Sequence, residues 1–238
     1  DGNGCSNTDQ ITITVNPLPT VDAGADQTIC EGENATLGGT PTGPAGATYA
    51  WDNAASLDDA TLANPTATPT TTTTYTVVVT DGTTGCTSQD QVVVTVNPLP
   101  IVDAGADQAI CIGGSATLGG TPTGPAGSTY AWDNAGSLDD ATIANPTATP
   151  AVTTTYTVTV TDGNGCSNTD QITITVNPLP TVDAGADQTI CEGENATLGG
   201  APTGPAGANY AWDNAGSLDD ATLANPTATP TVTTTYTV

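Results

Sequence analysis

YTVVVTDGTTGCTSQDQVVVTV, residues 75–96, is the stretch that decides the fold. Its first six residues are rich in Tyr, Val and Thr, which are the side chains that fit a β-strand. DGTTGC, residues 81–86, is a turn signal because Asp and Gly readily adopt turn conformations. The run after the turn has a counterpart at residues 11–15, ITITV, in which apolar and polar side chains alternate with period two. We therefore predict two strands joined by a tight turn.

The same pattern recurs along the whole chain. Trp51, Trp132 and Trp212 mark a repeat of about 80 residues. The repeats differ by one residue in the turn, where DGTTGC at 81–86 becomes DGNGC at 162–166. An insertion in a turn leaves the register of the flanking strands unchanged.

Proline pairs mark the boundaries between repeats. A short, stiff linker with the motif NPLP begins at Asn16, Asn97 and Asn177. The predicted divisions are the last strand of a preceding repeat at 1–15, complete repeats at 16–96 and 97–176, and a repeat lacking its last strand at 177–238. Two arrangements would complete that last repeat. The chain is a segment of a longer polypeptide, or the strand at 1–15 completes the last repeat of a neighbouring copy, as in donor-strand pairing.

No helix is expected in the chain. Gly, Pro, Thr and Asn interrupt every window, and no apolar stripe with helical spacing survives. About seven short strands in each unit, separated by turn signals, predict a two-sheet antiparallel β-sandwich. Trp51 is expected in a central strand as a core anchor. Its expected core neighbours are Leu37, Tyr75 and Val77.

The charge of the chain excludes several classes of partner. Its 238 residues include no Lys, Arg or His but 25 acidic residues, for a formal net charge of −25. No internal salt bridge between side chains can form. A uniformly acidic surface repels nucleic acid and anionic membranes, and no apolar run approaches the ~18 residues of a spanning helix. We therefore expect neither nucleic acid as a partner nor insertion into a membrane.

Several motifs together resemble a known family. They are VDAGADQTICEGENATLGG at 21–39, YAWDN at 49–53, NPTATPTTTTTYTVVVTDG at 64–82, and NPLP. Over essentially its whole length, the chain resembles the PKD-type, immunoglobulin-like tandem repeats of very large secreted bacterial surface proteins and adhesins. This resemblance implies all-β, immunoglobulin-like (PKD-type) antiparallel β-sandwich domains arranged end to end, which mostly act as spacers. Typical PKD domains continue Trp-Asp with a Phe-Gly-Asp-Gly turn, whereas this chain reads WDNAASLDD at 51–59, so no role of that turn is carried over.

The six cysteines follow the repeat. One lies near the start of each unit (Cys30, Cys111, Cys191), and one follows each last turn (Cys5, Cys86, Cys166). Because the first strand of an immunoglobulin-like sandwich can lie beside the last, the simplest pairing is within repeats, Cys30 with Cys86 and Cys111 with Cys166. Cys191 then pairs with the Cys5 equivalent that follows it. A metal site is the alternative, although neither His nor CxxC spacing is present. Disulfides predict a secreted, extracellular or cell-surface protein.

Recurring acidic positions predict calcium binding. Clustered carboxylates repel one another unless a cation neutralises them, and oxygen ligands suit Ca²⁺. One candidate site combines Asp22 and Asp26 with Asp81 of the last turn, and a second combines Asp52, Asp58 and Asp59. The counterparts in the other repeats are Asp103, Asp107, Asp162, Asp133, Asp139, Asp140, Asp183, Asp187, Asp213, Asp219 and Asp220. The alternative is that these carboxylates are solvated charges or cap turns.

Catalysis is not expected. Without His, Lys or Arg, and with oxidised cysteines, a glycosidase-like pair of acids is the one mechanism that the residues allow. A catalytic cleft is normally built once, whereas this chain has no segment outside its repeats. Surface glycans are an expected modification at Thr-rich stretches such as 67–76 and at the N-x-T sequons of Asn34 and Asn195.

Together these features predict a structural component of an extracellular fibre. The fibre is built from copies of the chain head to tail, or by continuation of the same long chain, with disulfides and Ca²⁺ stabilising it. The alternative is a passive spacer stalk of a cell-surface adhesin whose binding domain lies outside this segment. Direct binding of a carbohydrate or a protein by the repeats would predict exposed aromatic residues, whereas the Trp and Tyr residues here have core-like spacing.

Overall fold

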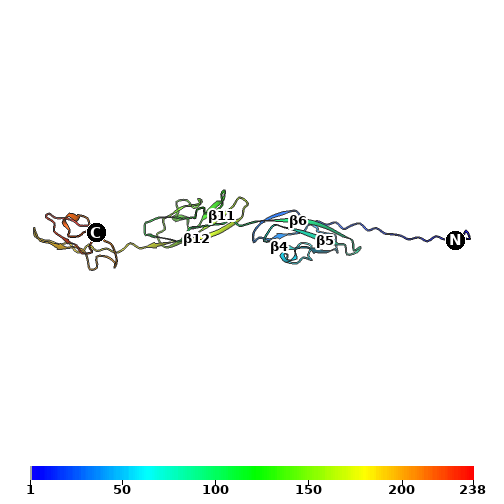
Figure 1. The fold of residues 1–238 in the computed structure, drawn as a ribbon, viewed down its shortest axis with the longest axis horizontal. Helices are drawn as coiled ribbons and strands as arrows, with labels where there is room; N and C mark the ends of the chain where they lie inside the picture. Colours follow the sequence, from blue (N-terminus) through cyan, green and yellow to red (C-terminus); the bar gives the residue numbers. More distant parts are fainter. Residues whose placement is uncertain (1) are drawn as a thin grey trace. The chain divides into compact units, whose positions relative to one another are not determined.

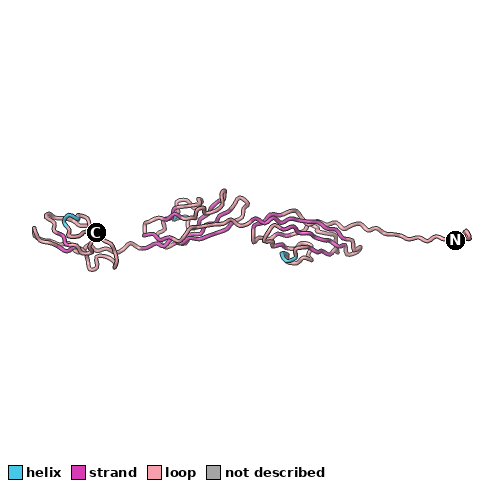
Figure 2. The backbone as a smooth tube through the Cα atoms, viewed as in Figure 1, coloured by secondary structure: helices cyan, strands magenta, loops and turns pink. Residues whose placement is uncertain are grey.

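The structure, a computed structural model, describes residues 2–238; Asp1 of the predicted segment 1–15 lies outside the described residues. Strands are its main regular elements, and Figure 2 draws them in magenta. The strands of the first repeat are β1 (Gln27–Cys30), β2 (Ala35–Thr36), β3 (Thr48–Trp51), β4 (Thr66–Ala67), β5 (Thr73–Thr80) and β6 (Thr87–Asn97). Those of the second are β7 (Gln108–Cys111), β8 (Ala116–Thr117), β9 (Thr129–Trp132), β10 (Thr147–Ala148), β11 (Thr154–Thr161) and β12 (Ser167–Asn177). The third repeat has β13 (Ala196–Thr197) and β14 (Thr227–Ala228).

Single turns of 3₁₀-helix are the only helical elements in the described residues. They are η1 (Ala54–Ser56), η2 (Ala135–Ser137) and η3 (Ala215–Ser217). Each follows an Asn in the left-handed conformation, such as Asn53 with φ 52°, which Asn tolerates better than most residues. No helix in residues 2–238 has the length and apolar character needed to cross a membrane.

The pattern of contacts between Cα atoms divides the chain into two compact units. One holds the residues up to Ala106 together with Thr117–Ala148 and Thr155–Ile172. The other holds Asp107–Ala116, Thr149–Thr154 and Thr173–Val238.

Each complete repeat is a small β-sandwich. The first repeat has a four-stranded sheet in the order β1-β6-β5-β3 and a two-stranded sheet of β2 and β4. Figure 1 labels β4, β5 and β6 of this repeat. The two sheets share one core, which includes Ala35 of β2, Ala67 of β4 and Val92 of β6. The second repeat has the same orders, β7-β12-β11-β9 and β10-β8. The predicted sandwich is therefore confirmed, with six strands per complete repeat in place of about seven.

The long hairpin of β5 and β6 is the predicted pair of strands. The two strands are antiparallel, with Tyr75 opposite Val92. β1 departs from this pattern because it runs parallel to β6, with Gln27 opposite Val94 and Cys30 opposite Asn97. Each complete repeat thus combines antiparallel strand pairs with one parallel edge strand, β1 or β7.

The predicted core residues are buried. Leu37, Tyr75 and Val77 are fully buried and Trp51 is 5% exposed. The indole N–H of Trp51 donates to the carbonyl of Leu62 at 3.0 Å, which satisfies its one polar group. Its predicted position in a central strand was wrong, because β3 lies at the edge of the four-stranded sheet.

Candidate functional site

Carboxylates on β6 and before β1 hold these two segments together. The backbone N–H of Ala23 donates to Oδ2 of Asp90 at 2.9 Å, and that of Val93 donates to Oδ1 of Asp26 at 2.8 Å. The second repeat makes the same pair of bonds, from Ala104 to Asp170 and from Thr173 to Asp107. These four carboxylates therefore act as fixed acceptors for backbone donors, a strong type of hydrogen bond.

The first predicted calcium site is not assembled as a group. Asp22 accepts the backbone N–H of Gly24 through Oδ1, and Asp81 accepts those of Thr83 and Thr84 within its own turn. Asp103, Asp162 and Asp183 accept turn N–H groups in the same way. Among residues 2–238, no three acidic or thiol side chains lie together as a metal site. Calcium binding stays a prediction, and the turn-capping alternative describes these bonds.

The second predicted site is also a set of backbone caps. Asp52 accepts the N–H of Thr76, Asp58 accepts that of Thr66, and Asp59 accepts both the N–H and the hydroxyl of Thr61. The counterparts Asp133, Asp139, Asp140, Asp213, Asp219 and Asp220 repeat these bonds.

Hydrogen bonds of this kind lower the pKa of several of these carboxyl groups. The backbone N–H of Thr66 is the main cause that lowers the pKa of Asp58 below its ordinary value. The hydroxyl of Thr61 is the main cause that lowers the pKa of Asp59. In the last turn, the backbone N–H of Thr84 does the same for the pKa of Asp81. All three bonds favour the ionised carboxylate.

The cross-strand role of the carboxylates at Asp26 and Asp90 was not predicted from the sequence. Its signal was present, because an Asp recurs in the middle of an otherwise strand-like run at Asp9, Asp90 and Asp170. A charged residue at a fixed place in a strand is expected to have a partner.

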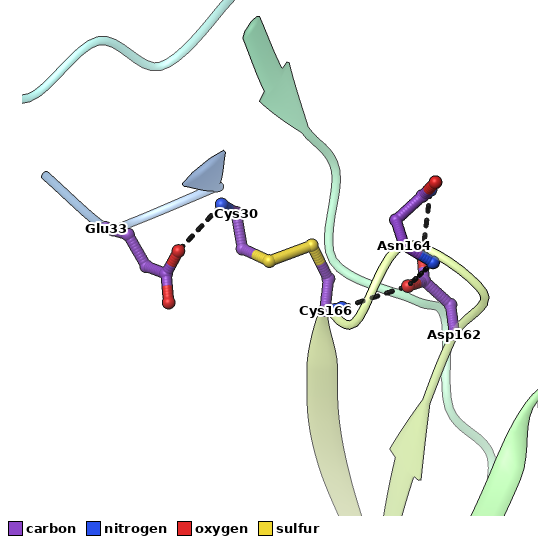
Figure 3. The surroundings of a disulfide bond; sticks show 5 residues. All are labelled: Cys30, Glu33, Asp162, Asn164 and Cys166. Atoms are coloured by element: carbon purple, nitrogen blue, oxygen red, sulfur yellow. Dashed lines mark hydrogen bonds between the residues drawn. A yellow bond between two sulfur atoms is a disulfide. The ribbon is translucent and has the colours of Figure 1, made fainter. Parts of the chain in front are cut away.

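The disulfide links two repeats. Cys30 at the end of β1 is bonded to Cys166 beside the turn before β12, with a Cα–Cα distance of 5.5 Å (Figure 3). The predicted pairs Cys30–Cys86 and Cys111–Cys166 were therefore wrong. The physical reason is the parallel pairing, which sets Cys30 level with Asn97. Cys86 precedes the other end of β6, roughly 36 Å away along an extended strand, far beyond the reach of a disulfide.

Carboxylates fix the backbone of both bonded cysteines. The N–H of Cys30 donates to Oε2 of Glu33 at 2.9 Å, and the N–H of Cys166 donates to Oδ1 of Asp162 at 3.0 Å (Figure 3). Asn164 donates its own backbone N–H to the same oxygen of Asp162. In the second repeat the Asp of the last turn thus positions a cysteine, a role that its place four residues before Cys166 could have indicated.

The third repeat contains an open groove of about 600 Å³. The side chains of Leu198, Trp212 and Tyr236 line it, as do Ala184, Asp187 and Thr233. Leu198 and Tyr236 are half-buried, whereas their counterparts Leu37, Leu118, Tyr75 and Tyr156 are fully buried. In the complete repeats the last strand lies at this position, β6 between β1 and β5 and β12 between β7 and β11. The groove therefore has the place of the last strand of a complete repeat.

A strand of the matching sequence lies exposed elsewhere in the chain. Residues 1–39 are identical to residues 162–200, so residues 6–16 repeat the sequence of β12. Residues 5–26 are assigned to no strand, and Figure 2 draws them as loop. Ile11 and Ile13 are 88% and 80% exposed, whereas the identical Ile172 and Ile174 of β12 are 1% and 0% exposed. One sequence thus occurs both as a buried strand and as an exposed segment.

One family model matches part of this chain. Residues 98–178 match the family model described as Ig-like domain, CHU_C associated. The second repeat is thus similar to an immunoglobulin-like domain. The first repeat has the same sheets, and the third shares its sequence motifs, so the predicted resemblance to immunoglobulin-like tandem repeats is confirmed.

Several solved structures match the chain at low sequence identity. An I-band fragment of titin is 13% identical and covers 78% of this chain and 76% of its own, with a TM-score of 0.36. Extracellular domains 3–5 of Drosophila OTK are 14% identical, with 68% and 61% covered and a TM-score of 0.32. A solution structure of a PKD domain is 23% identical, with 37% and 91% covered and a TM-score of 0.28. No curated protein matches the chain.

Proposed function

We propose that this chain is a structural subunit of an extracellular fibre, in which residues 6–16 of one copy complete the third immunoglobulin-like repeat of the next. The observation that carries the proposal is the pairing of the open groove with an exposed segment identical to β12. Such strand addition supplies backbone hydrogen bonds for affinity and side-chain pockets for specificity.

The second repeat supplies the template for the contacts. There Ile172 and Ile174 of β12 are buried, so Ile11 and Ile13 of the incoming copy would fill the groove. Burying each isoleucine contributes about 1.5 to 3 kcal/mol. This burial also removes two exposed apolar side chains that otherwise invite aggregation.

Three hydrogen bonds to side chains follow from the same template. In the second repeat the backbone N–H of Ala104 donates to Asp170, that of Thr173 donates to Asp107, and that of Val176 donates to the hydroxyl of Thr153. The first repeat makes the same three bonds. At the junction, the equivalent bonds run from Ala184 to Asp9, from Thr12 to Asp187 and from Val15 to Thr233. Ala184, Asp187 and Thr233 all line the groove.

The disulfide supports a location outside the reducing cytosol. Cys30 and Cys166 are bonded, and such bonds persist mainly in secreted and surface proteins. We also propose Ca²⁺ as the counterion of the fibre, because its net charge of −25 has no internal cation to balance it.

The test is the assembly state of the 238-residue chain. We expect fibres by negative-stain electron microscopy and a mass that grows with concentration by light scattering. The double variant Ile11→Asp, Ile13→Asp should remain monomeric, because it places charges in the apolar groove. Thr14→Asp is the matched control, since the identical Thr175 of β12 is exposed, and it should assemble. A wild-type chain that stays monomeric at all concentrations would overturn the proposal.

A further inference from the structure

The Cys30–Cys166 bond defines a rule for pairing between repeats. Cys30 ends the first strand of one repeat, and Cys166 follows the last turn of the next repeat. Cys111 and Cys191 hold the position of Cys30 in their repeats, and Cys5 and Cys86 hold the position of Cys166. Applying the rule to a third repeat completed by a second copy assigns a partner to each of these four cysteines.

The local geometry of Cys191 matches that of Cys30. The N–H of Cys30 donates to Oε2 of Glu33, and the N–H of Cys191 donates to Oε2 of Glu194 at 3.2 Å. The turn that follows is also the same, since Glu33 donates its N–H to the carbonyl of Cys30 and Glu194 does so to that of Cys191. The third repeat therefore presents an exposed thiol with the backbone arrangement of the bonded one.

The last-turn position is also prearranged. Asp81 donates its backbone N–H to the carbonyl of Cys86 at 2.9 Å, as Asp162 does to the carbonyl of Cys166. Cys86 is a half-buried thiol in this structure.

We propose that two disulfides lock each junction between copies, Cys111 of one copy to Cys5 of the next and Cys191 to Cys86 of the next. This inference rests on the proposed strand addition. Seating residues 6–16 in the third repeat places Cys5 at its last turn, where the rule pairs it with Cys111 of the repeat before. The first complete repeat of the second copy then follows the third repeat, and the rule pairs its Cys86 with Cys191.

The pairing differs from the Cys191–Cys5 bond that the sequence suggests. Those two cysteines would belong to one completed repeat, at opposite ends of its last strand. The parallel register of β7 with β12 sets Cys111 level with Asn177, and the same stagger would separate Cys191 from Cys5 by roughly 36 Å.

The chemistry needs an oxidant. Each bond forms from two thiols, which together lose two protons and two electrons. A small-molecule disulfide such as oxidised glutathione accepts them by thiol–disulfide exchange and is released as two thiols. An extracellular or periplasmic setting supplies such oxidising conditions.

The experiment is disulfide mapping of the assembled full chain after incubation with oxidised glutathione. Because the chain has no Lys or Arg, cleavage uses proteases specific for Asp or Glu before mass spectrometry. We expect cross-linked peptides that join Cys111 to Cys5 and Cys191 to Cys86, beside the intrachain Cys30–Cys166 peptide. Cross-linked peptides joining Cys191 to Cys5 would overturn the inference.

Denaturation without reductant separates this inference from the proposed function. We expect wild-type fibres to give a ladder of covalent multimers on a denaturing gel, and the double variant Cys111→Ser, Cys191→Ser to assemble yet run as a single chain. Cys30→Ser is the matched control and should retain the ladder. Fibres that form but run as single chains in the wild type would overturn the disulfides alone, whereas absence of fibres would overturn the proposed function.

Discussion

Ala23 donates its backbone N–H to Oδ2 of Asp90, and the two atoms lie 2.9 Å apart although the residues are separated by 67 positions in the sequence. Ala23 is fully buried and Asp90 is half-buried. This bond connects the segment before β1 to β6. It therefore joins the beginning of the first repeat to its last strand.

We expect Asp90→Ala to destabilise the first repeat by about 1.5 to 3 kcal/mol, because it leaves the buried N–H of Ala23 without its charged acceptor. Urea denaturation followed by circular dichroism measures the effect. Glu31→Ala is the matched control, since Glu31 is exposed, lies just after β1 and gives the same change in net charge. Equal losses in the two variants would show that the bond to Ala23 adds nothing.

We expect truncation of two leucines of the first repeat to have very different effects on stability. Leu37 is fully buried and Leu62 is 44% exposed. Leu37→Ala should lower the free energy of unfolding by about 2 to 5 kcal/mol, because it leaves a cavity in the core. Leu62→Ala should cost about 1 kcal/mol or less. The comparison uses the same urea titration, and a similar cost at both positions would contradict the observed burial.

We expect acid to remove the contribution of the capped carboxylates. The hydroxyl of Thr61 lowers the pKa of Asp59, so this group stabilises the folded state above its unfolded pKa of about 4 and loses that contribution as the pH falls further. The difference in stability between the wild type and Asp59→Asn should therefore shrink as the pH is lowered from about 5 to 2. Glu31→Gln, an exposed position with the same change in net charge, serves as the control. A difference that stays constant with pH would count against the cap.

We expect reduction to destabilise the first two repeats together. The bond between Cys30 and Cys166 closes a loop with a sequence separation of 136 residues, for which the chain-entropy estimate is about 5 kcal/mol. Thermal melts with and without dithiothreitol, made on the monomeric double variant Ile11→Asp, Ile13→Asp, measure the change. Adding Cys111→Ser to this variant leaves the Cys30–Cys166 bond intact and should not change the melt. An unchanged melting temperature in reductant would contradict the prediction.

We expect a chelator to lower the melting temperature of the oxidised chain if Ca²⁺ serves as its counterion. The reason is the net charge of −25, which repels itself in the folded state. Differential scanning calorimetry with Ca²⁺, with chelator, and with Na⁺ at matched ionic strength checks this. Identical melting in Ca²⁺ and in matched Na⁺ would leave general screening as the whole effect and refute a specific role of calcium.

Much of the fold could be predicted because its patterns are local. The alternation around Tyr75 and Val77 predicts their burial, and the turn at residues 81–86 predicts the β5–β6 hairpin. The stagger of β1 against β6 could not be predicted, since a short strand fits beside a longer one at several registers with equal hydrophobic pattern. That stagger alone decides whether Cys30 meets Cys86 or Cys166. The carboxylates were misread for a related reason, because their partners are backbone N–H groups, which no sequence pattern displays.

The Cys30–Cys166 bond also decides how the chain carries tension. A pull that enters before Cys30 and leaves after Cys166 passes through the two sulfur atoms. The strands from β2 to β11 lie between these cysteines and are bypassed by the load. The loop, with its sequence separation of 136 residues, amounts to about 450 Å of extended backbone that cannot be drawn out while the bond is intact. Oxidation therefore limits the length to which a pulled chain can stretch.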